Sequence, residues 1–146
     1  MKKLILAGLL SIGVASMAFA DENDIRIYKN MAKQANTLIS ACNTQSCKNF
    51  ITEIKEVSAW LEKAEPHRDK DDEKSKTKDK YYTNNAIQVM KKACASFKKL
   101  DTKDTNALAK KIDYEEVEDS IMKTCPMIES GFADLLMGIG SATTGK

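Results

Sequence analysis

The chain has 146 residues, of which 42% are hydrophobic, and a formal net charge of +2. This length fits one domain that can bury a modest core. The near balance of 23 basic and 21 acidic residues excludes the long-range attraction to nucleic acid or to an anionic membrane that a strongly basic chain would have.

Residues 1–20 have the pattern of a secretory signal peptide. Two lysines precede a continuous run of small and apolar residues over 4–15, and Ala18 and Ala20 occupy the positions that a signal peptidase reads. The run is shorter than the ~20 residues of a membrane span, and no cysteine follows the cleavage site to accept a lipid. We therefore expect a bacterial protein of the periplasm or the exterior, with no stable membrane anchor after cleavage.

The mature part, residues 21–146, is expected to form a single helical domain with 21 basic and 21 acidic side chains. It contains all four cysteines: Cys42, Cys47, Cys94 and Cys125. An even number of cysteines in an oxidising compartment predicts two disulfides. A structural zinc site is the alternative, but it usually has close-spaced ligands at both ends, and the last two cysteines lie far apart. We expect no metal site and no cofactor.

Apolar residues recur at three- and four-residue spacing over 24–41, which predicts the first helix. Asn23 or Asp24 can cap its start, because a short side-chain oxygen accepts hydrogen bonds from the first free amides. Asn43 suits the left-handed residue that often ends a helix. The stretch from Cys42 to Cys47 is therefore expected to be a tight turn.

The same spacing predicts a second helix over 46–64, with Thr44 or Ser46 as its cap. Trp60, the largest apolar side chain, is expected to anchor the core near the end of this helix. Pro66 then closes it, because the residue before a proline is disfavoured in the helical conformation.

Charged residues dominate the next segment, at about 65–80. Residues 62–80 contain seven acidic and seven basic side chains, and no large apolar residue occurs from Pro66 to Lys80. Such a segment has little to bury, so it is expected to be a mobile linker or a solvated helix extension. His67 lies within it and is expected to be solvated, without neighbours fixed for catalysis or metal binding.

A third helix is predicted over 81–100. A helical hairpin centred near residue 72 would place Cys47 opposite the region from Cys94 to Phe97. Two disulfide pairings remain open at this point: Cys42–Cys47 with Cys94–Cys125, or Cys47–Cys94 with Cys42–Cys125. The hairpin register favours the second, interlaced pairing.

The segment 101–111 is a polar connection that can hold a short helical stretch with Leu108 facing inward. Asp113 is a clear N-cap for the fourth helix, since a glutamate follows three residues later and apolar residues flank the cap. Pro126 is expected to break this helix and to begin another, whose apolar side chains extend over 128–139. The predicted fold is all-α, a small disulfide-stapled bundle of four to five helices.

The residues that catalysis would require are not brought together by the sequence. A nucleophile needs a base beside it, and the single histidine lies in the charged linker. The acidic residues of the fourth helix spread around its polar face, and no glycine-rich loop follows a strand. We expect no catalytic residues and no enzymatic activity.

Small exported chains without catalytic parts commonly act by binding. The spacing of Cys42 and Cys47 after an apolar helix resembles that of some small helical immunity proteins, over this helix and turn, without a specific motif. Envelope inhibitors and immunity proteins are often of this size and build, so we expect an inhibitor or immunity-type protein that neutralises a partner protein in the cell envelope. The alternative is a periplasmic stress chaperone that holds unfolded clients. The identity of the partner and the oligomeric state stay open, and nucleic acid is not an expected partner.

Overall fold

The computed structural model describes residues 20–133, and all of its regular structure is helical. The elements are α2 (Glu22–Lys33), α3 (Ala35–Ala41), α4 (Gln45–Ala64), the 3-10 helix η2 (Glu65–His67), α5 (Glu73–Phe97), α6 (Thr102–Ala109) and α7 (Tyr114–Glu129). This arrangement confirms the prediction of a small all-α bundle with two disulfides. The predicted signal peptide, except for Ala20, lies outside the described residues, as does most of the predicted helix at 128–139.

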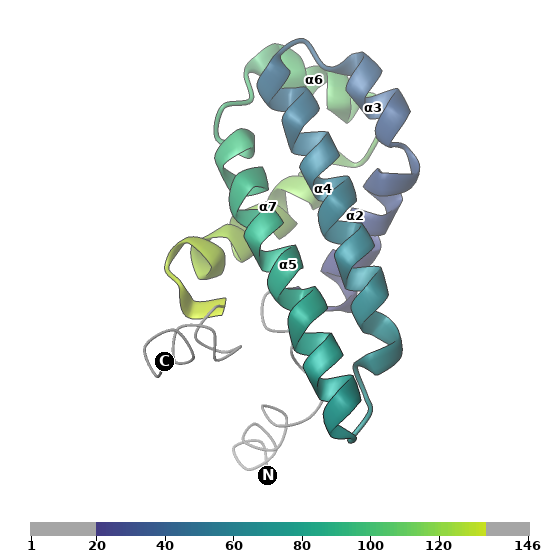
Figure 1. The fold of residues 1–146 in the computed structure, drawn as a ribbon. Coiled ribbons are helices and arrows are strands. Elements are labelled where there is room, and N and C mark those ends of the chain that lie inside the picture. The colour runs from purple at the N-terminus through teal and green to yellow at the C-terminus, as the bar shows by residue number, and fades with distance from the viewer. Residues whose placement is uncertain (1–19, 134–146) are drawn as a thin grey trace.

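The two longest helices, α4 and α5, form an antiparallel hairpin (Figure 1). The helices α2 and α7 pack behind this hairpin in the same view, and α3 and α6 lie at the end opposite its bend. The rings of Phe50 and Phe97 are 5.5 Å apart, and Ser96 Oγ donates a 2.8 Å hydrogen bond to Glu53 Oε1. These contacts confirm the predicted hairpin of the second and third helices. Within residues 20–133, no helix has the length and apolar content that crossing a membrane requires.

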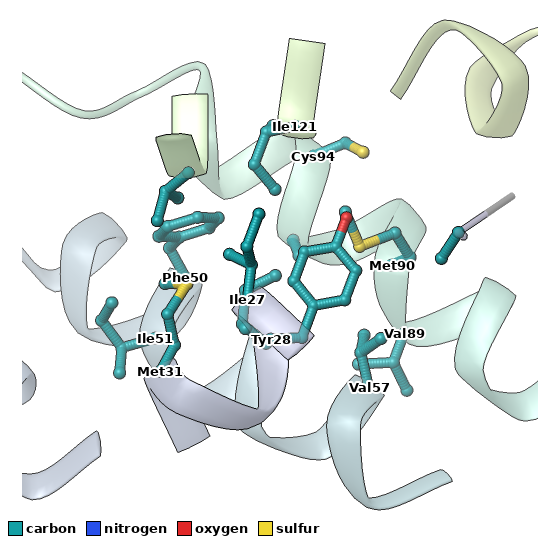
Figure 2. Close-up of a cluster of buried hydrophobic side chains, with 14 of the residues drawn as sticks. Ile27, Tyr28, Met31, Phe50, Ile51, Val57, Val89, Met90, Cys94 and Ile121 are labelled. Carbon is teal, nitrogen blue, oxygen red and sulfur yellow. The ribbon is translucent and has the colours of Figure 1, made fainter. Parts of the chain in front are cut away.

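Side chains from all six α-helices of residues 20–133 form one core, part of which is shown in Figure 2. Each fully buried large apolar side chain stabilises the fold by about 1.5–3 kcal/mol relative to an exposed one. The side chains labelled in the figure include Ile27, Tyr28 and Met31 of α2, Phe50 and Val57 of α4, Met90 of α5 and Ile121 of α7.

A buried polar network joins α2 to α7. The carboxylate of Asp24, only 1% exposed, accepts hydrogen bonds from Ser120 Oγ at 2.7 Å and from Lys123 Nζ at 2.9 Å. The hydroxyl of Tyr28 lies 3.2 Å from Ser120 Oγ and 3.3 Å from Thr124 Oγ1. The hydrogen bond to Asp24 raises the pKa of Lys123, while burial raises the pKa of Tyr28. Breaking this network would leave a buried charge without compensation, so it fixes α2 against α7.

The first helix differs from the prediction at its start and at its centre. Asp21, rather than Asn23 or Asp24, is the N-cap. It forms a capping box, in which its carboxylate accepts a hydrogen bond from the amide of Asp24 and the Asp24 carboxylate accepts one from the amide of Asp21. The helix also divides at Gln34, which has φ −104° and ψ 12°. Leu38, beyond this break, is fully buried. The break at Gln34 depends on tertiary packing, so the spacing of apolar residues could not predict it.

The turn between Cys42 and Cys47 is confirmed, with one correction. Thr44 caps α4, because its hydroxyl oxygen accepts a 3.1 Å hydrogen bond from the amide of Cys47. Asn43 is not left-handed, since no non-glycine residue among residues 20–133 has a positive φ. The chain leaves α3 through the extended backbone of Cys42 instead.

The carboxylate of Asp104 in α6 holds this turn from across the molecule. Its Oδ1 accepts hydrogen bonds from the amides of Asn43 at 2.7 Å and Thr44 at 3.1 Å, and its Oδ2 accepts one from the Thr44 hydroxyl at 2.6 Å. Burial opposes the charged form, but these bonds and the amide of Asp101 outweigh it and lower the pKa of Asp104. The cap of α4 is therefore itself fixed by a residue 60 positions away.

The expected mobile linker over 65–80 is partly helical. The helix α5 begins at Glu73, with Asp72 as its N-cap, instead of near residue 81. Ser75 and Asp79 are buried, at 8% and 3% exposure. Residues 73–80 therefore extend the helix, as one of the two alternatives predicted, but this extension is not fully solvated. Its buried side chains are polar, so a pattern of apolar residues could not reveal them.

The expected break at Pro126 is wrong. Pro126 lies inside α7, which continues to Glu129, and the chain then turns through Gly131 with φ +84°. A proline inside a helix costs about 3 kcal/mol because it removes a hydrogen bond and crowds the preceding turn. Cys125 on one side is bonded to α5, and Ile128 on the other side is fully buried. These two attachments keep the helical path across the proline.

The disulfides join Cys42 to Cys47 and Cys94 to Cys125, with Cα–Cα distances of 5.5 and 5.8 Å. All four cysteines are thus bonded, as predicted, but the favoured interlaced pairing is wrong. In α5 the residue that faces Phe50 of α4 is Phe97, three positions after Cys94, whereas Cys94 faces α7. The register of the hairpin was close to the prediction, and the rotation of α5 about its axis decided the pairing.

Candidate protein-binding surface

Three aromatic rings meet at the surface of the hairpin, near its bend. Trp60 of α4 lies 6.2 Å from Tyr82 in a stacked arrangement and 6.4 Å from Tyr81 in an edge-on one, and the two tyrosine rings are 5.6 Å apart. Tyr81 is 60% exposed. Trp60 is half-buried and packs at the edge of the core, so it is only partly the core anchor that was expected. We call these three residues the aromatic surface.

One lysine contacts the aromatic surface, and others follow nearby in α5. The Nζ atom of Lys63 lies 4.8 Å from the centre of the Trp60 ring, a cation–π contact. Lys78 and Lys74 precede Tyr81 by three and seven residues, which places them on its side of α5. The helix α5 carries six lysines and only two acidic residues, one of which is the buried Asp79. The site therefore combines exposed aromatic area with lysine side chains on the same side of the hairpin.

This combination is typical of protein–protein contacts. Tryptophan and tyrosine supply much of the binding energy at such interfaces, because they bury a large area and lose little conformational freedom. Two helices fixed by core packing hold the rings in place, so little ordering is needed when a partner binds. The sequence did not reveal the surface, although adjacent tyrosines opposite a tryptophan across a predicted hairpin were the available signal.

His67 is half-buried and has neighbours, so the expectation that it is solvated holds only in part. Its Nδ1 lies 3.4 Å from Ser75 Oγ, and its ring centre lies 6.0 Å from that of Tyr82. Asp79 accepts a 3.2 Å hydrogen bond from Thr83 Oγ1. Burial raises the pKa of Asp79, against the effects of this bond and of the nearby positive charges.

Serine, histidine and aspartate side chains are thus brought near one another at the bend of the hairpin. A nucleophile must be accessible to a substrate, and Ser75 is only 8% exposed. Through His67, these contacts join η2 to the first turns of α5. We assign them no catalytic step. Across the described part of the chain, no group of three or more histidine, cysteine or acidic residues is placed to hold a metal ion.

Further hollows on the molecule include two that lie away from the aromatic surface. One, of about 430 Å³, lies over the Cys94–Cys125 disulfide between α5 and α7 and includes Phe97, Tyr114 and Met122 in its lining. Burial, with a contribution from the charge of a nearby glutamate, raises the pKa of Tyr114 to about 12. The other hollow, of about 410 Å³, follows α2 and is lined mainly by charged side chains.

Comparison with known protein families, with curated proteins and with solved structures finds no match to this chain.

Proposed function

We propose that the chain is an exported, non-catalytic binding protein that neutralises a partner protein in the bacterial cell envelope, as an inhibitor or immunity-type protein. The partner binds to the aromatic surface of the hairpin. The observation that carries this proposal is the cluster of Trp60, Tyr81 and Tyr82, with Tyr81 60% exposed. The rings belong to two packed helices, so the surface is formed before the partner arrives.

The disulfides indicate the kind of cellular compartment in which the protein folds. Two disulfides and no free cysteine among residues 20–133 fit an oxidising, extracytoplasmic compartment. We propose that this compartment is the periplasm or the exterior of a bacterium, reached through the signal peptide at 1–20. The mature protein should then begin at Asp21. Intact-mass measurement of the exported protein tests this, and a mass that includes the first 20 residues would contradict it.

The binding role is tested with a pair of matched variants. Tyr81→Ala removes the most exposed ring of the aromatic surface, and Met122→Ala removes a side chain of similar exposure, 62%, from α7. A stoichiometric complex captured from envelope extract should be weakened by about thirtyfold or more in the first variant, the effect of losing a contact worth ~2 kcal/mol. The second variant should bind as the unaltered protein does.

The same experiment separates inhibition from chaperone activity. An inhibitor forms one complex of fixed stoichiometry from its folded state, and the purified complex should lack the activity of the partner. A chaperone would bind many unfolded clients and would loosen its own helices first. Equal binding by both variants, or a mixture of clients, would refute inhibition through the aromatic surface.

A further inference from the structure

The charged hollow along α2 has an excess of positive side chains. It is lined by Glu22, Ile25, Arg26, Lys29, Asn30 and Lys33 of α2, together with Glu65 and Arg68. Four of these residues are cationic and two are acidic. Its volume of about 410 Å³ is in the range of sites that bind small ligands, ~300–1,000 Å³. We call it the α2 groove.

Two of its cations are already paired. Arg26 forms an ion pair of 2.6 Å with Glu116 of α7, and Lys29 Nζ lies 3.5 Å from Glu65 Oε1. Lys33 and Arg68 have no ion-pair partner within 4.0 Å among residues 20–133. The charge of Arg68 also acts on the buried carboxylate of Asp79, which lies too far away to form an ion pair with it. Lys33 and Arg68 are therefore the cations of the groove that have no close acidic partner.

Arg68 adds a second, independent observation. Its Nε atom is buried and has no hydrogen-bond partner. A desolvated donor without an acceptor is unfavourable, and a guanidinium is suited to hydrogen-bonding a carboxylate or a phosphate with two nitrogens at once. Arg68 lines the groove, so an anionic oxygen beside its guanidinium can accept hydrogen bonds from it, and a turn of the side chain toward the groove would give Nε an acceptor.

We propose that the α2 groove is a binding site for a small anion with at least two carboxylate or phosphate groups, held mainly by Lys33 and Arg68. The hydrogen bonds would be charge-assisted, and such bonds are about twice as strong as neutral ones. Two anionic groups are required because one alone would leave either the lysine or the guanidinium uncompensated. The site lies on α2 and η2, apart from the aromatic surface, and does not depend on the proposed function.

Two chemically simple probes test the site. Citrate represents clustered carboxylates and inorganic pyrophosphate represents phosphates, each titrated into the mature, disulfide-intact protein by calorimetry. At least one probe should bind with a stoichiometry of one, and the affinity should fall as salt is added, because the attraction is electrostatic. The probe that binds more tightly identifies the anionic group. If neither probe binds, the proposal is wrong.

Matched variants separate a defined site from general attraction to lysines. The double variant Lys33→Gln/Arg68→Gln should weaken binding by about tenfold or more, a factor equivalent to ~1.4 kcal/mol. The control Lys48→Gln/Lys55→Gln removes the same charge from exposed positions of α4, outside the groove. This control should bind almost as tightly as the unaltered protein, and an equal loss in both double variants would refute the site.

Two single variants keep the test decisive if the double variant is unstable. Lys33 is exposed, so Lys33→Gln should fold normally and should still weaken binding. Arg68→Lys keeps the charge but removes Nε and the planar pair of donors, so it should also weaken binding. Unchanged affinity in both single variants would overturn the proposal. Tyr81→Ala should leave anion binding intact, which separates this test from that of the proposed function.

Discussion

Replacing Asp104, the one acidic side chain within α6, is expected to destabilise the fold strongly. The carboxylate accepts bonds from two backbone amides and one hydroxyl in the Cys42–Cys47 turn, at 2.6–3.1 Å. Asp104 itself is fully buried. The variant Asp104→Ala removes every one of these bonds, while Asp104→Asn keeps one oxygen for the amides and removes the charge.

The magnitude follows from these bonds. A hydrogen bond to a charged group contributes about 1.5–3 kcal/mol, and three of them would set an upper range of about 4.5–9 kcal/mol. Water can reach part of the turn once the carboxylate is gone, because Asn43 is exposed. We therefore expect a loss of about 3 kcal/mol for Asp104→Ala and about 1 kcal/mol for Asp104→Asn. Either loss is measurable against a total of about 5–15 kcal/mol.

Urea denaturation with a circular dichroism signal measures these free energies of unfolding. Asp119→Ala is the matched control, because Asp119 is an exposed acidic residue of α7. It should change the free energy by less than about 0.5 kcal/mol, as surface substitutions usually do.

The pH dependence gives an independent check. The hydrogen bonds lower the pKa of Asp104 in the folded state below its ordinary value of 3.8. The stabilisation is therefore fully present above that value and is lost as the pH falls below it through the folded pKa. The difference between the unaltered protein and Asp104→Asn should shrink in that acidic range. A difference that does not depend on pH, or an alanine variant as stable as the control, would refute the reasoning.

Other parts of the fold lead to further predictions. Removing the Cys94–Cys125 bridge by serine substitution should cost about 3–4 kcal/mol and removing Cys42–Cys47 about 2 kcal/mol, because the first closes the longer loop in the chain-entropy model; the opposite order in urea denaturation would contradict this explanation. Peptide mapping without reductant should recover these two pairs, and a peptide linking the turn to α5 would disprove the structure here. Burial raises the pKa of Asp79, so its charged form destabilises the fold as the pH rises above 3.8. Asp79→Asn should therefore raise the melting temperature at pH 7, with the gain disappearing in acid, and a lower melting temperature at pH 7 would show that the charge is needed.

Local chemistry explains what could be predicted from the sequence. The helical segments follow from the spacing of apolar residues, because each position depends on neighbours three or four residues away. Thr44 was one of two candidate caps, and Asp113 was the single candidate for its helix; both act on amides three residues later. Leu108 faces inward as expected. The oxidation of all four cysteines needed only their even number and the predicted compartment.

Features with distant partners could not be predicted in the same way. The start of α5 at Glu73 depends on buried polar side chains, which a search for apolar spacing passes over. The continuation of α7 through Pro126 depends on attachments to other helices, and proline chemistry alone gives the opposite expectation. The aromatic surface exists because Trp60 and Tyr82, 22 residues apart in the chain, come within 6.2 Å across the hairpin.

The disulfides show most clearly which features the sequence determines and which depend on the tertiary structure. The sequence by itself determined that Cys42, Cys47, Cys94 and Cys125 would be oxidised, and it indicated the hairpin on which Cys94 lies. Only the tertiary structure decided which sulfur atoms meet, because that depends on the rotation of α5 about its own axis. One residue turns a helix by about 100°, so a register known to within a few residues does not fix the face on which a cysteine lies. Packing against α4 and α7 together directs Cys94 toward Cys125.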